Sequence, residues 1–267
     1  MLKISFLTTF RSSDEYRLAN LETVISHISA EFPDWEIVVV EQDKKCTLAR
    51  HPLAKKINYI DACNPGLFNK SWGMNVAFRH SSGDILVVSD ADMIVSADDL
   101  QRAVRTCEKE LDAVRPYGRL IDMTASETED YLQGGKLPDV PEKTRGYDRG
   151  HASEALCMAG GIYILTREFF VRVGGMDERF YGWGGEDDAM SIKLQSMSPK
   201  VAIARMAKAW HLWHPGDNCY SHDHYQKNRQ LLQQYKLLSK DELLELCRQL
   251  AKTIGNGSIT RLSQKKR

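Results

Sequence analysis

Short apolar runs alternate with segments of helical spacing along the first hundred residues. The runs are rich in β-branched and aromatic residues and predict strands at 3–10, 36–43, 57–62 and 84–92. The intervening segments carry apolar side chains every three to four positions. They predict one helix from a cap at residues 12–14 to about residue 30 and another over 69–80. Strands that alternate with helices are typical of an α/β fold with a mainly parallel sheet.

The pattern is less regular in the second half of the chain. Residues 122–155 are rich in Gly, Pro, Thr and acidic residues with little periodicity, which predicts a long lid-type loop or a disordered segment. A strand is expected at 158–165, then a helix capped by Thr166, further helical spacing at 187–195, and a strand with a histidine-bearing turn within 201–215. Leucines at helical spacing after residue 230 predict C-terminal helices, followed by a polar, basic tail.

The composition is typical of a globular protein. With 267 residues, of which 42% are hydrophobic and 27% charged, the chain can build one large α/β domain. Lys plus Arg equal Asp plus Glu at 36 each, so the charge gives no argument for a nucleic-acid partner. The six cysteines are scattered without CxxC pairs, which predicts free thiols in a reducing compartment.

The apolar runs are too short to predict a membrane span. None reaches the roughly 18 residues that a transmembrane helix needs, and charges interrupt the N-terminal run too early for a signal peptide. Three basic residues at the C-terminus are too few for stable membrane binding. We therefore expect a cytoplasmic protein, with at most peripheral contact at the inner face of the membrane. Its oligomeric state is left open.

Polar residues follow the predicted strands at positions that would share one rim of the sheet. They are Arg11, then Glu41, Gln42 and Asp43, then Asp90 and Asp92. In open α/β sheets, ligands bind outside the carboxyl ends of the strands. Asp90 and Asp92, a DxD triplet, would project to one side of an extended backbone, where two carboxylates suit a hard divalent cation. The alternative is a strand end with two solvated acids.

A second group of candidate metal ligands lies near residue 211. HLWH places His211 and His214 three residues apart, on one face of a helical turn or close together in a tight loop. With an aspartate they form a mixed nitrogen and oxygen site that suits manganese and is open to magnesium, cobalt or zinc. The alternative is a pair of partly buried histidines, and His222 and His224 are competing candidates.

The segment FYGWGGEDDAM combines aromatic residues, glycines and three consecutive acids. In a water-poor cleft, one of Glu186, Asp187 and Asp188 can act as a general base on a sugar hydroxyl while its neighbours accept hydrogen bonds. Tyr181 and Trp183 supply flat faces for a sugar ring, and the glycines allow close approach. The alternative, compatible with the first, is an acidic helix N-terminus, whose dipole would lower the pKa of the base and keep it ionised.

This chain resembles the β-1,4-galactosyltransferases and the related bacterial chondroitin-polymerase-type transferases in three segments that occur in the same order: SDADMIV, MAGGIYILTREFFVRVGGMDERFYGWGGEDDAM and HLWH. The similarity runs from about residue 4 to about residue 230, includes FNKSWGMNVAF and is most specific in GWGGEDD. It implies the GT-A fold, a single Rossmann-like mixed sheet flanked by helices. It also implies a UDP-linked sugar donor and a manganese ion that bridges the two phosphates.

The resemblance implies a division of the chain and a role for each candidate residue. Residues 1–220 would be the catalytic domain, with a nucleotide-binding half at 1–100 and an acceptor and catalytic half at 101–220, and residues 221–267 a helical extension with a basic tail. Asp187 would be the catalytic base. The acceptor would contact Glu186, Asp188 and Tyr181, the metal would be held by Asp92, His211 and His214, and the donor would contact Arg11, Glu41, Asp43, Lys70, Asp90, Gly160, Gly161 and Trp183.

One departure from the family concerns the metal. His211 falls where the animal galactosyltransferases usually carry methionine, and imidazole is a harder ligand than a thioether. Magnesium or cobalt is therefore expected to be tolerated more broadly beside manganese.

The resemblance implies an inverting transfer of a hexose, galactose or N-acetylgalactosamine, from a UDP-sugar to a hydroxyl of a glycan or lipid-linked glycan in polysaccharide assembly. The acceptor cannot be read, because the 122–155 loop diverges from the animal enzymes. Three alternatives stay open: the same fold with UDP-glucose, UDP-N-acetylglucosamine or UDP-glucuronate as donor, a non-catalytic sugar- or nucleotide-binding module, and a metal phosphohydrolase. We rank the last lowest because it leaves the aromatic and glycine-rich pocket without a purpose.

Overall fold

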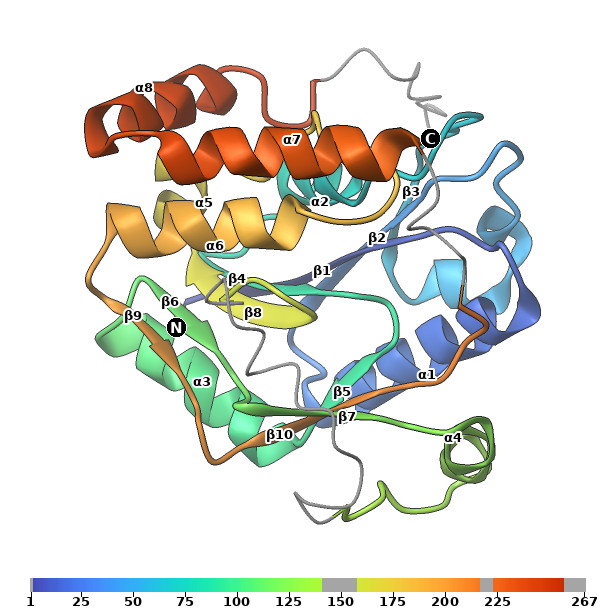
Figure 1. Cartoon of the computed structure of the whole chain (residues 1–267). Helices are drawn as coiled ribbons and strands as arrows, with labels where there is room; N and C mark the ends of the chain where they lie inside the picture. The colour runs from blue at the N-terminus through green and yellow to red at the C-terminus, as the bar shows by residue number, and fades with distance from the viewer. Residues whose placement is uncertain (1, 141–157, 217–222, 257–267) are drawn as a thin grey trace.

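The computed structural model describes residues 2–140, 158–216 and 223–256. Within them, seven strands form a mixed sheet in the order β3-β2-β1-β4-β8-β6-β9 (Figure 1). Strands β1 to β4 of this sheet are mutually parallel where they pair, whereas β8 is antiparallel to β4 and β6. The strands are β1 (Ile4–Phe10), β2 (Glu36–Glu41), β3 (Asn58–Asp61), β4 (Ile85–Ser89), β6 (Ala113–Arg115), β8 (Ile162–Thr166) and β9 (Val201–Ile203). The predicted α/β class with a mixed sheet is confirmed.

Helices cover both faces of the sheet. One face is covered by α1 (Glu15–Glu31) and α3 (Ala97–Lys109), and the other by α2 (Lys70–Arg79), α5 (Arg167–Arg172) and α6 (Glu186–Met197) (Figure 1). Because side chains alternate along a strand, Phe6 and Val87 enter the core beneath α1 and α3, while their neighbours Leu7 and Val88 enter the core beneath α2, α5 and α6. This double burial explains why the strands read as continuous apolar runs.

A smaller sheet in the described residues brings three distant segments together. It consists of β5 (Met93–Val95), β10 (Lys208–His211) and β7 (Arg119–Asp122), with β10 in the middle. Strand β10 is antiparallel to β5 and parallel to β7, and its last residue, His211, lies opposite both Met93 and Asp122. The sheet therefore places Asp92, the residue just before β5, beside the end of β10.

Capping residues mark the starts of three of the predicted helices. The side chains of Asp14, Asn69 and Thr166 accept hydrogen bonds from backbone amides of the first turns of α1, α2 and α5, as capping residues do. The predicted helices at these positions are confirmed. Helix α3 follows the cap Ser96 and was not predicted.

The segment at 122–155 differs from its prediction. Helix α4 (Ala125–Leu132) lies within it, and a capping box between Thr124 and Glu127 starts this helix. The sequence TASE carries that signal, so a purely irregular loop was the wrong prediction for this part. Residues 141–155 of the segment lie outside the described residues.

Two predicted strands have different limits. The strand expected at 158–165 begins only at Ile162, because the chain turns at Gly160 and Gly161, and Gly161 has a φ of +70°. The stretch 201–215 forms two short strands, β9 and β10, which belong to different sheets.

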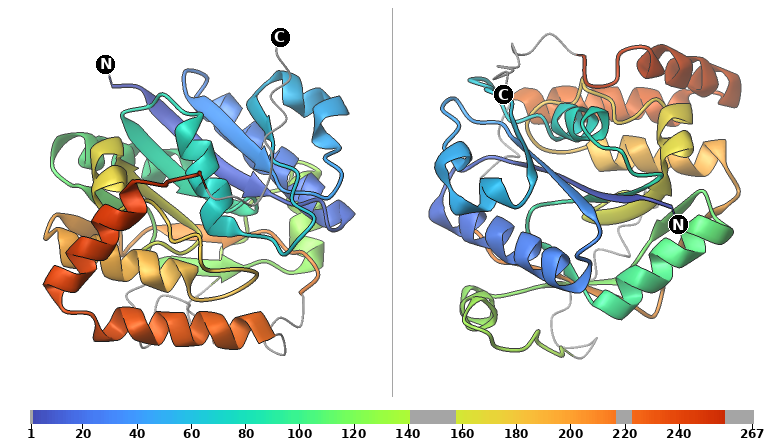
Figure 2. Two further views of the ribbon diagram at one scale, coloured as in Figure 1. Left: turned by 90° about the horizontal axis from the view of Figure 1, so that it is seen from above. Right: turned by 180° about the vertical axis from the view of Figure 1, so that it is seen from behind.

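The C-terminal helices α7 (Asp223–Leu237) and α8 (Lys240–Ala251) lie outside α5 and α6 (Figures 1 and 2). Their residues Leu232, Tyr235 and Cys247 share a buried cluster with Phe180 and with Ala189 of α6. The described C-terminal residues are thus helical and pack against the segment that carries the three acids. The basic tail, 257–267, lies outside the described residues.

Two short 3₁₀ helices, Leu48–Arg50 and Pro52–Lys55, complete the described elements. None of the helices in the described part of the chain is both long and apolar enough to cross a membrane. The described cysteines, Cys46, Cys63, Cys107 and Cys247, are all free thiols.

Candidate active site

The candidate site lies at the carboxyl ends of β1, β2 and β4, where the structure of an open α/β sheet predicts a ligand crevice. Asp90 follows β4, and its amide donates a hydrogen bond of 2.8 Å to the carbonyl of Gly161, the residue before β8. The carbonyl of Gly160 accepts a hydrogen bond of 2.6 Å from the hydroxyl of Tyr117. A Cβ atom added at Gly160 would meet only open space, so the chain leaves room at this point of the rim.

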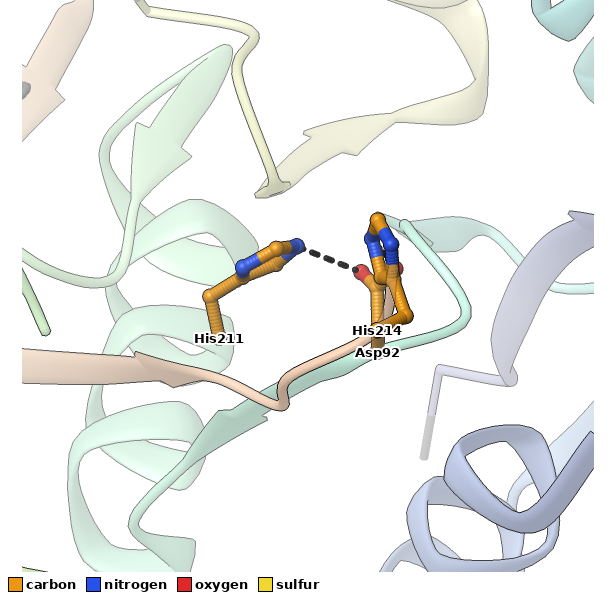
Figure 3. A group of neighbouring side chains, drawn as sticks. All are labelled: Asp92, His211 and His214. Atoms are coloured by element: carbon orange, nitrogen blue, oxygen red, sulfur yellow. Dashed lines mark ion pairs between the residues drawn. The ribbon is translucent and has the colours of Figure 1, made fainter. Parts of the chain in front are cut away.

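Three of the predicted metal ligands converge. Asp92, His211 and His214 each offer one ligand atom within 4.8 Å of the others. The distance from Asp92 Oδ1 to His211 Nε2 is 3.6 Å, and that from Asp92 Oδ2 to His214 Nε2 is 3.3 Å. In Figure 3 the two imidazoles face the carboxylate from different sides. Of the competing histidines, His224 lies near Tyr181, with 6.4 Å between ring centroids, and His222 lies outside the described residues.

Backbone hydrogen bonds fix the segment that carries the two histidines. The amide of Leu212 donates to the carbonyl of Asp92 at 2.8 Å. The amide of Trp213 donates to Thr128 Oγ1 of α4 at 2.9 Å, and its carbonyl accepts from Asn20 Nδ2 of α1 at 3.0 Å. The turn between His211 and His214 is therefore held by three elements, and both rings have a defined position beside Asp92.

The chemistry of this group fits a divalent cation. Burial alone would raise the pKa of Asp92, but the neighbouring imidazoles of His211 and His214 outweigh it and hold the pKa well below its usual range. Asp92 Oδ1 is buried and accepts no hydrogen bond, so it has a lone pair free for a cation. One carboxylate and two imidazoles make a donor set suited to manganese and other first-row metals.

Lys70 connects this rim to the predicted catalytic base. Its Nζ lies 2.7 Å from Asp90 Oδ1 and 3.0 Å from each carboxylate oxygen of Asp187. The cation comes from the first turn of α2 and the base from the first turn of α6. Asp187 and Asp90 thus share one ammonium group, which brings Asp187 to the segment that also carries Asp92.

The electrostatics of Asp187 differ from the prediction. Burial raises its pKa, Lys70 lowers it, and the carboxylates of Glu186 and Asp90 raise it, with a net shift to about 8. The expected lowering by the helix dipole was wrong, because burial and the two neighbouring carboxylates outweigh the lowering influences, of which Lys70 is the largest. A carboxylate with a pKa near neutrality is a stronger base than an ordinary aspartate.

The three acids form the first turn of α6. Gly185 precedes them at the N-cap with a φ of +91°, a conformation that favours glycine. Burial raises the pKa of Glu186, and Glu186 Oε2 is buried and accepts no hydrogen bond. Asp188 lies in the same turn and is partly exposed. The acidic helix N-terminus and the acidic pocket, which the sequence suggested as compatible interpretations, are therefore the same structural feature.

Neighbouring elements hold the aromatic loop before α6. The amide of Gly182 donates to the carbonyl of Phe68 at 2.8 Å. Asn228 of α7 donates through Nδ2 to the carbonyls of Tyr181 and Trp183, at 2.8 and 3.2 Å. The Trp183 side chain is 48% exposed and stacks on Tyr225 of α7, with 5.7 Å between ring centroids. Sequence analysis missed Tyr225 and Asn228, because only the leucine spacing of α7 gave a signal, and it indicated packing.

The polar residues after β1 and β2 mostly bind other parts of the chain. The Arg11 guanidinium donates to the carbonyls of Gln42, Asn64 and Gly66, at 2.5 to 3.1 Å. Asp43 accepts a hydrogen bond of 2.7 Å from the amide of Ser12. These contacts join three loops at the rim, and the predicted donor contacts of Arg11 and Asp43 stay predictions.

Glu41 does not lie on the open rim, contrary to the prediction. It is fully buried, and its carboxylate accepts hydrogen bonds from the amides of Thr47 and Leu48 and from the hydroxyl of Tyr59. Its position is explained by the loop that follows β2, which folds back and uses the carboxylate to satisfy its amides. Sequence analysis also missed Asp122, whose Oδ1 lies 3.1 Å from Nδ1 of His211.

Two family models match successive parts of the chain. Residues 9–122 match the model described as "Glycosyl transferase family 2", and residues 150–215 match the one described as "N-terminal domain of galactosyltransferase". The first match contains β2 to β7 and the DxD triplet, and the second contains the three acids and both histidines of the metal group.

Curated relatives are similar over parts of their length. The chain is 29% identical to β-1,4-galactosyltransferase 4 of Rattus norvegicus over 93 residues, which are 33% of this chain and 26% of the relative. It is 26% identical to polypeptide N-acetylgalactosaminyltransferase 11 of Xenopus tropicalis over 177 residues, which are 60% of this chain and 28% of the relative. The chain thus spans about a quarter of the length of these relatives.

Solved glycosyltransferase structures share the fold. A structure of GalNAc-T7 with UDP, GalNAc and Mn²⁺ has a TM-score of 0.60 at 15% identity, over 94% of this chain and 54% of that one. S. aureus TarS in complex with UDP-GlcNAc gives 0.57 at 15%, over 91% and 70%. The catalytic domain of Drosophila β-1,4-galactosyltransferase 7 with xylobiose gives 0.54 at 17%, over 86% and 80%. The chain therefore has the GT-A fold, and its two matched segments are similar to glycosyltransferase family 2 and to the galactosyltransferases.

Proposed function

We propose that this protein is an inverting, metal-dependent glycosyltransferase that moves galactose or N-acetylgalactosamine from a UDP-sugar to a hydroxyl of a glycan acceptor. The observation that carries the proposal is the contact of Lys70 with both Asp90 and Asp187. Through it a base with a raised pKa lies beside Asp90, two residues before Asp92 of the candidate metal group. A transferase needs this combination, because a base must accept the proton of the acceptor hydroxyl and positive charge must stabilise the departing diphosphate.

The proposed reaction is a single displacement. Asp187 accepts the proton of the acceptor hydroxyl while that oxygen forms a bond to the anomeric carbon of the donor sugar. The bond between this carbon and the β-phosphate oxygen breaks, and UDP leaves with the electron pair. In this proposal Glu186 accepts a hydrogen bond from a second hydroxyl of the acceptor, which its buried Oε2 atom, without a hydrogen bond, supports.

Asp92, His211 and His214 are the residues that would hold the metal, and manganese suits them best. When bound, the ion would offset the charge that builds on the departing diphosphate. The GalNAc-T7 structure contains Mn²⁺ beside UDP, which supports this part of the proposal. The contact between Lys70 and Asp90 also supports it, since a cationic side chain at this rim suits a diphosphate.

The donor sugar and the acceptor are proposed from relatives. Galactosyl- and N-acetylgalactosaminyltransferases are among the similar proteins, while TarS was solved with UDP-GlcNAc. We favour the first two sugars, with a glycan or lipid-linked glycan as acceptor. The cytoplasmic location expected from the scattered cysteines, with at most peripheral membrane contact, belongs to this proposal and is tested by cell fractionation.

The direct test is a panel of UDP-sugars with Mn²⁺ and a set of glycan acceptors, in which released UDP is measured and the product linkage and anomeric configuration are determined by NMR. We expect transfer from UDP-galactose or UDP-N-acetylgalactosamine with inversion. Retention of the donor configuration would contradict the displacement by Asp187, and absence of transfer from every donor would contradict the function.

The variant Asp187→Asn tests the assignment of the base in the same assay. Removal of a positioned general base lowers turnover by about 10²–10⁴, whereas the amide keeps the shape of the side chain. We expect the Kd for the donor, measured by calorimetry, to stay within about threefold of the unmodified protein while turnover falls by that factor. Normal turnover in the Asp187→Asn variant would remove Asp187 from its role.

A further inference from the structure

His211 lies between two carboxylates. Its Nε2 atom is 3.6 Å from Asp92 Oδ1, within the candidate metal group, and its Nδ1 atom is 3.1 Å from Asp122 Oδ1, on the other side of the ring. The carboxylate of Asp122 is about one third exposed, while the side chains of Asp92 and His211 are mostly covered. Asp122 does not belong to the three residues whose ligand atoms converge.

The backbone fixes Asp122 and His211 relative to each other. They are the last residues of β7 and β10 and lie opposite each other in a parallel ladder. The amide of Met123, the next residue along the chain, donates to the carbonyl of His211 at 3.0 Å. Because neighbouring strands lie about 4.8 Å apart, side chains at such paired positions on one face of the sheet are in reach of each other. The contact is therefore built into the small sheet.

A carboxylate at Nδ1 has a specific chemical consequence for a metal-binding imidazole. When Nδ1–H donates to Asp122, the lone pair of Nε2 is presented toward Asp92, and the ring cannot rotate without losing the hydrogen bond. Histidines that bind metals nearly always have such a partner, and its loss typically lowers metal affinity about 10- to 100-fold. His214 differs, because its Nδ1 lies 3.0 Å from the backbone carbonyl of Pro215, which plays the same part without a side chain.

We propose that Asp122 is a positioning residue of the metal site, which acts through Nδ1 of His211 and directs Nε2 toward a cation held by Asp92 and His214. The inference rests on the metal site of the proposed function. It adds a fourth side chain to the residues that determine metal binding, and it predicts that metal affinity depends on β7 as well as on the DxD segment.

The test measures binding of Mn²⁺ alone to the full chain, by calorimetry and by the loss of the free-ion EPR signal. We expect Asp122→Ala to weaken binding about 10- to 100-fold, and Asp122→Asn to restore part of the affinity, because its amide oxygen still accepts from Nδ1–H. Asp139→Asn is the matched control. Asp139 is an exposed carboxylate that contacts Lys208 of β10 at 2.6 Å, and its loss should leave the affinity unchanged.

A double-mutant cycle separates positioning from direct ligation. In a His211→Met background the ring is absent, so Asp122→Ala should have no further effect on the Kd for Mn²⁺. A further loss in that background would mean that Asp122 binds the ion directly and would overturn the proposal. Equal affinities of the unmodified protein and of its Asp122→Ala and Asp122→Asn variants would overturn it as well, while the transferase activity could stand. If the unmodified protein does not bind Mn²⁺, both this inference and the metal site fall, whatever the transfer assay shows.

Discussion

Asp187 has the environment of a working base rather than that of a surface acid. It is partly buried at a helix start, contacts one ammonium group and has two further carboxylates nearby. Each of these features changes its proton affinity, and burial is the strongest of them. Among the three consecutive acids of α6, only the family resemblance favoured Asp187 as the base. The contact with Lys70 spans 117 positions and has no local signal, so its electrostatic effect could not be predicted.

The pKa of Asp187 leads to a pH dependence of the reaction. A base acts when it is deprotonated, so kcat/KM should rise with pH through about 8 and then level off. Lys70 lowers this pKa, so Lys70→Met should move the rising limb to higher pH. A pH–rate profile of both proteins checks this. A limb near about pH 4, where an ordinary aspartate titrates, or an unmoved limb in the Lys70→Met variant, would contradict the account.

At the scale of single elements, prediction succeeded where the signal is local. The strands β1, β2 and β4 are buried on both faces, and their apolar runs are sufficient to identify them. Helix α4 has an equally local capping signal in TASE, which was outweighed by the surrounding Gly, Pro and acidic residues. The strands β5, β7 and β10 have three or four residues each. They are stable only because they pair with one another, so their existence depends on contacts that are distant in sequence.

Helix α7 should control the order of the aromatic loop. Asn228 is buried and donates to two carbonyls of the loop, so Asn228→Ala leaves both without these partners. We expect a loss of about 1–3 kcal/mol in the free energy of unfolding, and faster hydrogen exchange of the amides at 181–185. Gln233→Ala, on the exposed side of the same helix, is the control. Unchanged exchange at 181–185 in the Asn228→Ala variant would show that α7 does not hold this loop.

Helix α6 contains a buried cation, and this predicts a second pH effect. Lys193 is fully buried, its Nζ donates to the carbonyl of Gly175, and burial lowers its pKa to about 8. The unfolded chain binds this proton up to about pH 10.4, whereas the folded chain releases it near pH 8. Lys193 therefore destabilises the fold at pH 7, and this effect diminishes as the pH rises from about 8 to 10.

Lys193→Met removes the titration while it keeps a similar volume. We expect the Lys193→Met variant to be at least as stable as the unmodified protein at about pH 7, and to lose this relative advantage by about pH 10. Urea unfolding of both proteins at the two pH values measures the difference, which cancels the titration of other groups. A difference that does not change with pH would contradict the buried, shifted amine.

At the scale of the whole molecule, the fold explains why chemically related residues are far apart in the chain. The large sheet places the DxD triplet, Asp90 to Asp92, at the end of β4. The small sheet brings His211 to Asp92, and the first turns of α2 and α6 bring Lys70 and Asp187 together. Sequence analysis identified most of these residues by type and order. It could not identify Asp122 or the enclosed position of Glu41, because both depend on how loops and strands pair.

The most direct measurement is an anomalous difference map, collected at the manganese absorption edge from crystals of this protein grown with Mn²⁺ and UDP. We predict one strong peak within coordination distance of Asp92, His211 and His214, next to the UDP diphosphate and on the rim that Asp187 faces. A peak that these three side chains cannot reach, or a bound diphosphate without a peak beside them, would contradict the site on which the proposed chemistry depends.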